Sequence, residues 1–146
     1  MPVVLLDTRD LKKLGEQFIA AGPEVDLSFR AAISAAGEVD AVEARQNARA
    51  FPREYGGTDR IAQSVKVKRR VYSVKVQAGG DNAPEAAPLE NHGLSGSFRH
   101  PVFGDFGNWV SQAAHPFLTP AAESKLPEFE ELVLAAVDVG LAKVAV

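Results

Sequence analysis

The chain has no cysteine among its 146 residues, so it has neither a disulfide framework nor a thiolate metal site. It also lacks a long apolar run. The N-terminal stretch MPVVLLDTRD holds four consecutive apolar residues and no basic region before them, so we expect no signal peptide there. No segment approaches the roughly 18 apolar residues of a membrane span. We therefore expect a soluble protein that is made in a cytoplasm and has no membrane partner.

Neither sign of charge is in large excess, because the formal net charge is −3 at pH 7. Such a chain has no bulk attraction for nucleic acid or for an anionic membrane. Its 46% hydrophobic and 24% charged residues are typical of an ordinary globular protein. The length suits one domain, which we expect to span residues 1–146.

Motifs for catalysis, metal binding or cofactor binding are also missing. The three histidines, His92, His100 and His115, lack metal-ligand spacing, and two of them precede proline, which suits a structural corner. The stretch GLSGS at 93–97 is not the Gly-x-Ser-x-Gly of a nucleophile loop. The glycines form no phosphate-binding fingerprint. We expect no metal, no cofactor and no enzymatic activity.

The first fifty residues predict two helices. Apolar residues at helical spacing indicate a first helix capped by Asp7 or Thr8, and these are Leu11, Leu14, Phe18 and Ile19. Gly22-Pro23 stops this helix and starts the next, because proline is tolerated in a first turn. From there to Arg49 the sequence is rich in alanine, which predicts a thin helix. That helix packs closely on a sheet or, in addition, on another subunit.

The middle of the chain predicts a small antiparallel sheet. Ser64–Val67 and Val71–Val76 alternate apolar and polar residues, so one face of the sheet is buried and the other is wet. Lys68-Arg69-Arg70 is expected near a tight turn. We expect a loop over Arg53–Asp59 and an irregular edge strand over Ala83–Pro88, since proline is excluded from central strands.

The C-terminal segment predicts a long helix that begins at Thr119 as N-cap and Pro120 in the first turn. Apolar residues continue at three-and-four spacing to the end of the chain. Pro127 is expected to kink this helix or divide it near Leu126. Together the elements predict an α+β fold with N-terminal helices, a small antiparallel sheet and a long C-terminal helix.

A basic cluster lies in the predicted sheet, and three interpretations of it stay open. It is a solvated or edge-protecting face, a contact with an acidic surface of another subunit, or a site of phosphate contact with DNA. The cluster consists of Lys66, Lys68, Arg69, Arg70 and Lys75. The acidic surface that we consider consists of Glu123, Glu128, Glu130 and Glu131.

The segment Phe98–Pro120 concentrates large side chains between X-Pro corners. It holds four of the eight phenylalanines and the only tryptophan. A segment this apolar either packs under the C-terminal helix or inserts into a neighbouring protein, where Trp, Phe and Arg are the usual anchors. The candidate interface residues are Phe98, Arg99, His100, Phe103, Phe106, Trp109 and Phe117.

Four short elements follow one another in this half of the chain. They are Glu-x-x-Gly at 90–93, Arg-His-Pro-Val-Phe-Gly at 99–104, Trp-Val-x-Gln at 109–112 and Pro-Phe-Leu-x-Pro-Ala at 116–121. In their order and spacing they resemble the small head–tail joining proteins of long-tailed double-stranded DNA phages, which are also called tail-completion or neck proteins. The resemblance covers roughly residue 64 to the C-terminus.

The resemblance implies an α+β structural protein of the virion, made in the host bacterial cytoplasm. Copies of the chain would form a ring in the phage neck, with six copies expected, that joins the head connector to the tail tube. The implied partners are the chain itself, a head connector, adaptor or stopper protein, and a tail tube or tail terminator protein. Viral DNA would pass through the channel without specific binding.

Two alternatives remain beside this interpretation. Within the same class, the chain is a tail terminator or a head-completion stopper, because these proteins share small α+β architectures. From a different class, it is a small DNA-binding module that uses the predicted hairpin Lys66–Lys75. The negative net charge disfavours the second alternative.

Overall fold

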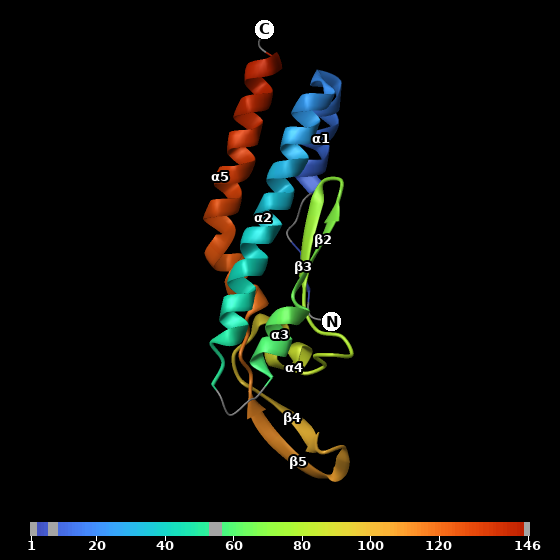
Figure 1. Cartoon of the computed structure of the whole chain (residues 1–146), viewed down its shortest axis with the longest axis vertical. Coiled ribbons are helices and arrows are strands. Elements are labelled where there is room, and N and C mark those ends of the chain that lie inside the picture. Colours follow the sequence, from blue (N-terminus) through green and yellow to red (C-terminus); the bar gives the residue numbers. More distant parts are fainter. Residues whose placement is uncertain (1–2, 6–8, 53–56, 145–146) are drawn as a thin grey trace.

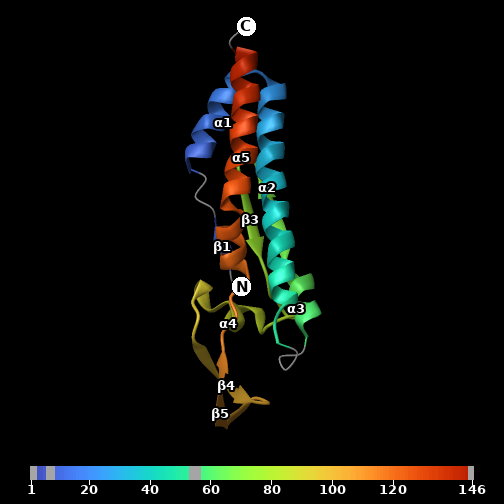
Figure 2. The same cartoon turned by 90° about the vertical axis from the view of Figure 1, so that its left-hand side faces the viewer.

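Two helices of 27 residues each run along the molecule, α2 (Pro23–Arg49) and α5 (Leu118–Val144). The computed structural model describes residues 3–5, 9–52 and 57–144. The two helices lie side by side in opposite directions, and α1 (Arg9–Ala21) packs beside them near the C-terminal end of α5 (Figures 1 and 2). Gly22, at φ 135°, separates α1 from α2, as the sequence predicted.

A three-stranded sheet covers one side of this helical layer. Its strands are β1 (Val3–Leu5), β2 (Lys66–Arg70) and β3 (Ser73–Gln77) in the order β1-β3-β2, and both pairs are antiparallel. The helices lie on the inner face of the sheet, where Val74 and Val76 are buried (Figure 2). The predicted antiparallel sheet and the predicted α+β class are therefore confirmed.

The end of the molecule opposite the C-terminus is built from short elements. These are α3 (Thr58–Ser64), α4 (Ala86–Glu90) and the 3₁₀ turn η2 (Asn91–Gly93). From this end projects an antiparallel hairpin of β4 (Ser97–Val102) and β5 (Asp105–Ala113), which we call the hairpin (Figure 1). The rest of the described chain is called the body.

The alanine-rich helix α2 packs closely on β3, as predicted. A Cβ atom placed on Gly37 would lie 2.1 Å from Cγ2 of Val74, so no larger residue fits there without displacing the strand. Ala41, Ala44 and Ala48 are completely buried on the same helix. Contact of α2 with another subunit stays a prediction.

The core consists of two clusters stacked along α2. The upper cluster joins α1, the first half of α2, β3 and the later part of α5, with Phe29 completely buried in it. The lower cluster joins the second half of α2, α3, α4 and the start of α5 around Phe117. Val67 on β2 packs against both clusters.

Two of the predicted segments in the middle of the chain were wrong. Ser64 ends helix α3 and does not begin a strand, because its hydroxyl donates to the carbonyl of Ile61 at 2.6 Å and accepts from the amide of Gly79 at 2.9 Å. The predicted edge strand 83–88 is a turn leading into α4. Pro88 is tolerated there because first-turn amides of a helix have no intrahelical partner. In the predicted loop 53–59, residues 58 and 59 belong to α3, and 53–56 lie outside the described residues.

Helix α5 begins at Leu118, one residue before the predicted cap. Pro127 lies inside this helix and does not divide it, whereas the alternative, a kink at the proline, stays a prediction. Buried contacts on both sides of the proline, at Ala121 and Val133, hold the two halves of the helix in place. The predicted cap of the first helix at Asp7 or Thr8 lies outside the described residues.

Candidate functional site

Glu90 joins α4 to the start of α5, in the part of the body from which the hairpin projects. Its side chain is only 2% exposed, and its carboxylate accepts backbone hydrogen bonds at 2.7, 2.8 and 2.9 Å from Phe117, Leu118 and Thr119. The hydroxyl of Thr119 donates a fourth, at 2.7 Å. These amides form the start of α5, where they lack intrahelical partners and the helix dipole favours an anion. Glu90 therefore does the capping that the sequence assigned to Thr119.

The turn after Glu90 packs directly on this helix start. Asn91, His92 and Gly93 all have positive φ, and a Cβ atom on Gly93 would lie 2.5 Å from the hydroxyl oxygen of Thr119. The Glu-x-x-Gly element and the element at 116–121 are thus one structural unit, which we call the Glu90 clamp. Sequence reasoning missed this unit, because its two parts are far apart in the chain.

At the tip of the hairpin, Phe103 is unusual both in its backbone conformation and in its exposure. Phe103 and Gly104 occupy the turn with φ of 50° and 77°, and Val102 pairs with Asp105 across it. Turns with two positive φ values favour Asn-Gly or Gly-Gly, whereas phenylalanine rarely adopts this conformation. The side chain of Phe103 is also fully exposed. Neither the local backbone nor the core of this chain explains a phenylalanine there.

Two more aromatic side chains are exposed on β5. Phe106 is 78% exposed and Trp109 is 43% exposed, with their ring centroids 6.2 Å apart. The indole N–H of Trp109 donates to the carbonyl of Phe106 at 2.8 Å, and the guanidinium of Arg99 lies 6.0 Å from the centre of the indole ring. We call Phe103, Phe106 and Trp109 the aromatic tip. Phe106 and Trp109 contact each other, whereas the ring of Phe103 is fully exposed.

The other candidate interface residues lie at the base of the hairpin. Phe98 is half-buried against the lower core, and its ring centroid lies 5.9 Å from that of His100. Phe117 is completely buried, with its ring edge-on to Phe51 at 5.8 Å. Its prediction as an interface residue was therefore wrong, because the chain has already entered the body at Ala114. The segment divides into a buried base and an exposed tip.

The predicted basic cluster also divides. Strand alternation turns Arg69 toward α2, where it donates to the hydroxyl of Ser34 at 2.5 Å and pairs with Glu38. The other four side chains lie on the outer face of the sheet, and no acidic group of the described residues pairs with them. We call this surface the basic face, and it consists of Lys66, Lys68, Arg70 and Lys75.

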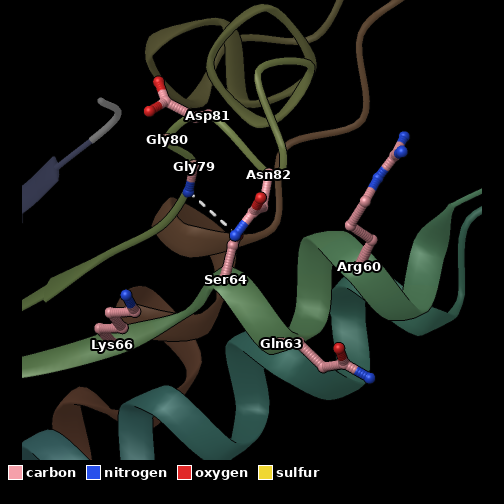
Figure 3. Close-up of a pocket in the computed structure, with 8 residues that line it drawn as sticks. All are labelled: Arg60, Gln63, Ser64, Lys66, Gly79, Gly80, Asp81 and Asn82. Carbon is pink, nitrogen blue, oxygen red and sulfur yellow. Dashed lines mark hydrogen bonds between the residues drawn. The ribbon is translucent and has the colours of Figure 1, made fainter.

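A pocket of about 360 Å³ lies beside α3, and Figure 3 shows the residues that line it. Its two cationic side chains, Arg60 on α3 and Lys66 on β2, lie at different sides of the view and do not point toward each other (Figure 3). Arg60 is also engaged, because it pairs with Glu85 at 2.5 Å. Gly79 and Ser64 bind each other at the pocket wall. The pocket therefore offers no set of groups that would orient a small ligand.

Two buried aspartates on α2 have contrasting environments. Asp26 accepts a hydrogen bond from the hydroxyl of Tyr72 at 2.6 Å and pairs with Arg30 at 2.6 Å. Asp40 is equally buried, yet its Oδ1 atom has no hydrogen-bond partner among the described residues. Burial raises the pKa of Asp40 to about 6. The ionised form of Asp40 therefore lowers the stability of the fold, and this residue lies on α2 between the two core clusters.

Three further observations bear on the class of protein. Within the described residues, no three His, Asp or Glu side chains come together as metal ligands. No helix in the described ranges combines the length and apolarity that a bilayer crossing requires. Comparisons with protein-family models, with curated proteins and with solved structures find no match to this chain.

Proposed function

We propose that this chain is a structural protein of the virion neck of a long-tailed double-stranded DNA phage, where copies of it form a ring that joins the head connector to the tail tube. The hairpin is the observation that carries this proposal. It presents the aromatic tip on an arm that projects from the body (Figure 1). The four ordered sequence elements that resemble neck proteins all contribute to this arm or to the clamp at its base.

The physics of the hairpin favours a protein partner. An isolated two-stranded hairpin is marginally stable in water, so an arm of this kind gains stability when another surface packs on it. Exposed Trp and Phe beside Arg are the residue types that most often anchor protein interfaces. The Glu90 clamp orders the base of the arm in advance, which lowers the entropy cost of docking. Adhesion between neck proteins needs such surfaces and no turnover.

The partners follow from this role. Other copies of the chain close the ring, and a head connector, adaptor or stopper protein and a tail tube or terminator protein lie on either side of it. The protein is then a component of the virion, and DNA passes through the ring without specific binding. Tail terminator and head-completion stopper remain the alternative stations for a protein with this architecture.

Deleting the gene from the phage or prophage that carries it tests the proposal. We expect DNA-filled heads and separate tails in electron micrographs, because the two halves of the particle are no longer joined. A plasmid copy of the wild-type gene restores joined particles, and a copy with Phe106→Ala and Trp109→Ala does not. Ile19→Ala, at an exposed apolar position on α1, serves as the matched control. Normal joined particles in the absence of the protein would contradict the proposal.

The basic face favours a second candidate, a DNA-binding module. Four cations on one surface, with no ion-pair partner among the described residues, are sufficient for salt-sensitive phosphate contacts. The net charge of −3 limits such binding, and we expect no submicromolar affinity at physiological salt. Titration of a labelled duplex measures this directly. Submicromolar binding that is lost in the Lys66→Ala, Lys68→Ala, Lys75→Ala triple variant would favour the DNA-binding module over the neck protein.

A further inference from the structure

The basic face carries charges that the described part of this chain leaves unpaired. In the register of β2 and β3, Lys68 lies directly opposite Lys75, with Lys66 and Arg70 on either side along the strand. Like charges directly opposite each other on neighbouring strands destabilise a sheet. Departures of this kind from the ordinary rules concentrate at functional surfaces. We therefore expect the basic face to bind an anionic partner outside the described part of the chain.

An acidic surface of matching size lies on the outer side of α5. Four exposed carboxylates of this helix have no ion-pair partner among the described residues, whereas Glu128 pairs with Lys125 at 3.6 Å. We call this surface the acidic face, and its carboxylates are Glu123, Glu130, Glu131 and Asp138. Leu134 and Leu141, seven residues apart, are exposed on the same helix.

The two faces cannot meet within one molecule. The sheet packs on one side of the layer formed by α2 and α5, so the outer face of the sheet and the outer face of α5 point away from each other (Figures 1 and 2). The carboxylates extend over about 22 Å of helix, at about 1.5 Å per residue. The cations of β2 extend over about 13 Å of strand, at about 3.3 Å per residue. One basic face therefore fits within the length of one acidic face.

We propose that the basic face of one copy docks on the acidic face of the next copy, and that this contact closes the ring. The inference rests on the proposed function, because it specifies the contact between subunits of that ring. Two different patches on opposite sides of each subunit make a heterologous contact, which generates rings or filaments. The hairpin then remains available for the proteins above or below the ring.

A second copy suits the basic face better than DNA does. The same chain supplies an acidic surface that also lacks a partner among the described residues, and its exposed leucines give the contact an apolar component that a phosphate backbone does not provide. The aliphatic stems of the lysines on the sheet can pack against Leu134 and Leu141. Charge complementarity of this kind sets the register between partners and speeds their encounter.

Charge reversal in two separate variants of the full chain tests the contact. The first variant carries Lys68→Glu and Lys75→Glu, and the second carries Glu130→Lys and Glu131→Lys. In each variant the changed face keeps two of its original charges and gains two of the opposite sign, so its net charge is zero and it no longer attracts the unchanged face. We therefore expect self-association at least about tenfold weaker than in the wild type. In an equal mixture, the unchanged basic face of the second variant can meet the unchanged acidic face of the first, and we expect association to return. Lys12→Glu with Lys13→Glu, on α1, is the control for net charge.

Sedimentation velocity at about 50 mM and about 500 mM salt gives the first readout, since screening weakens exposed charge pairs. Carbodiimide crosslinking followed by mass spectrometry gives the second. Mixed isotope-labelled and unlabelled protein should yield intermolecular links between the lysines of the basic face and the carboxylates of the acidic face. The proposal would be overturned by a wild type that stays monomeric up to about 1 mM at low salt, or by a mixture no better associated than its components.

Two further outcomes separate this proposal from the proposed function. If the charge-reversed variants still join heads to tails in the deletion strain, the neck assignment stands and the subunit contact lies elsewhere. If the wild type does not self-associate but binds a duplex of about 30 base pairs, and the Lys68→Glu, Lys75→Glu variant does not, the basic face serves DNA and the contact between copies is wrong.

Discussion

The body and the hairpin use the same residue type in opposite ways. Phe29 and Phe117 are completely buried in the two core clusters, whereas Phe103 is fully exposed and Phe106 nearly so. In the body, aromatic rings stabilise the fold of this chain. At the tip of the hairpin, Phe103 and Phe106 contribute little to that fold. The difference shows that burial explains the phenylalanines of the body and does not explain those of the tip, for which we proposed a role in assembly.

The largest expected effect tests this division directly. Phe117→Ala removes a buried ring and should lower the free energy of unfolding by about 3–5 kcal/mol. Phe106→Ala removes an exposed ring and should change it by no more than about 0.5 kcal/mol. Thermal and urea unfolding of the purified variants measure both values. Equal destabilisation would show that the hairpin belongs to the stabilising core.

The junction between the two regions gives the next prediction. Glu90→Ala leaves three amides at the start of α5 without their acceptor, so we expect a loss of about 3 kcal/mol. Thr119→Val removes only the hydroxyl donor and should cost about 1 kcal/mol. Urea unfolding ranks the two variants. If Glu90→Ala were no worse than Thr119→Val, the backbone hydrogen bonds of the Glu90 clamp would not be the main link between α4 and the start of α5.

Asp40 provides a pH test within the body. Its pKa is raised from 3.8 to about 6 by burial, so the folded state binds this proton more tightly than the unfolded state does. The ionised carboxylate therefore costs stability above about pH 6, and this cost disappears as the pH falls toward 4. We expect Asp40→Asn to stabilise the protein by about 2 kcal/mol at pH 8 and by progressively less below pH 6. A difference between variant and wild type that does not depend on pH would contradict this account.

The smallest effect on stability is expected at the hairpin turn. Phe103→Asn places a residue that tolerates positive φ before Gly104, so the melting temperature should stay unchanged or rise slightly. Joined particles should nevertheless decrease in the complementation experiment, because one exposed ring of the aromatic tip is lost. Particle counts in micrographs and a thermal melt on the same variant measure both. Normal joining with this variant would restrict the anchoring role to Phe106 and Trp109.

Local chemistry in the sequence predicted much of the fold. The Gly22-Pro23 break and the alanine-rich helix that fits over Val74 depend on neighbours in the chain, and both were found where they were expected. The alternating strand predicted over 71–76 is β3, but it begins at Ser73, because residues 71 and 72 form the turn from β2. The ends of elements were less predictable. The side chains of Ser64 and Thr119 each suit more than one place in a helix or strand. Contacts with distant residues determine which place each of them takes.

The candidate site was predicted in composition but not in arrangement. The sequence by itself determined that large aromatics would gather near β4 and β5 and that cations would gather on β2 and β3. Only the tertiary structure decided that Phe117 is buried while Phe103 is exposed, and that Arg69 faces α2 while Lys68 faces outward. It also brought Glu90 to the start of α5. Burial and ion pairing depend on which distant segments meet, and one-dimensional patterns carry little information about that.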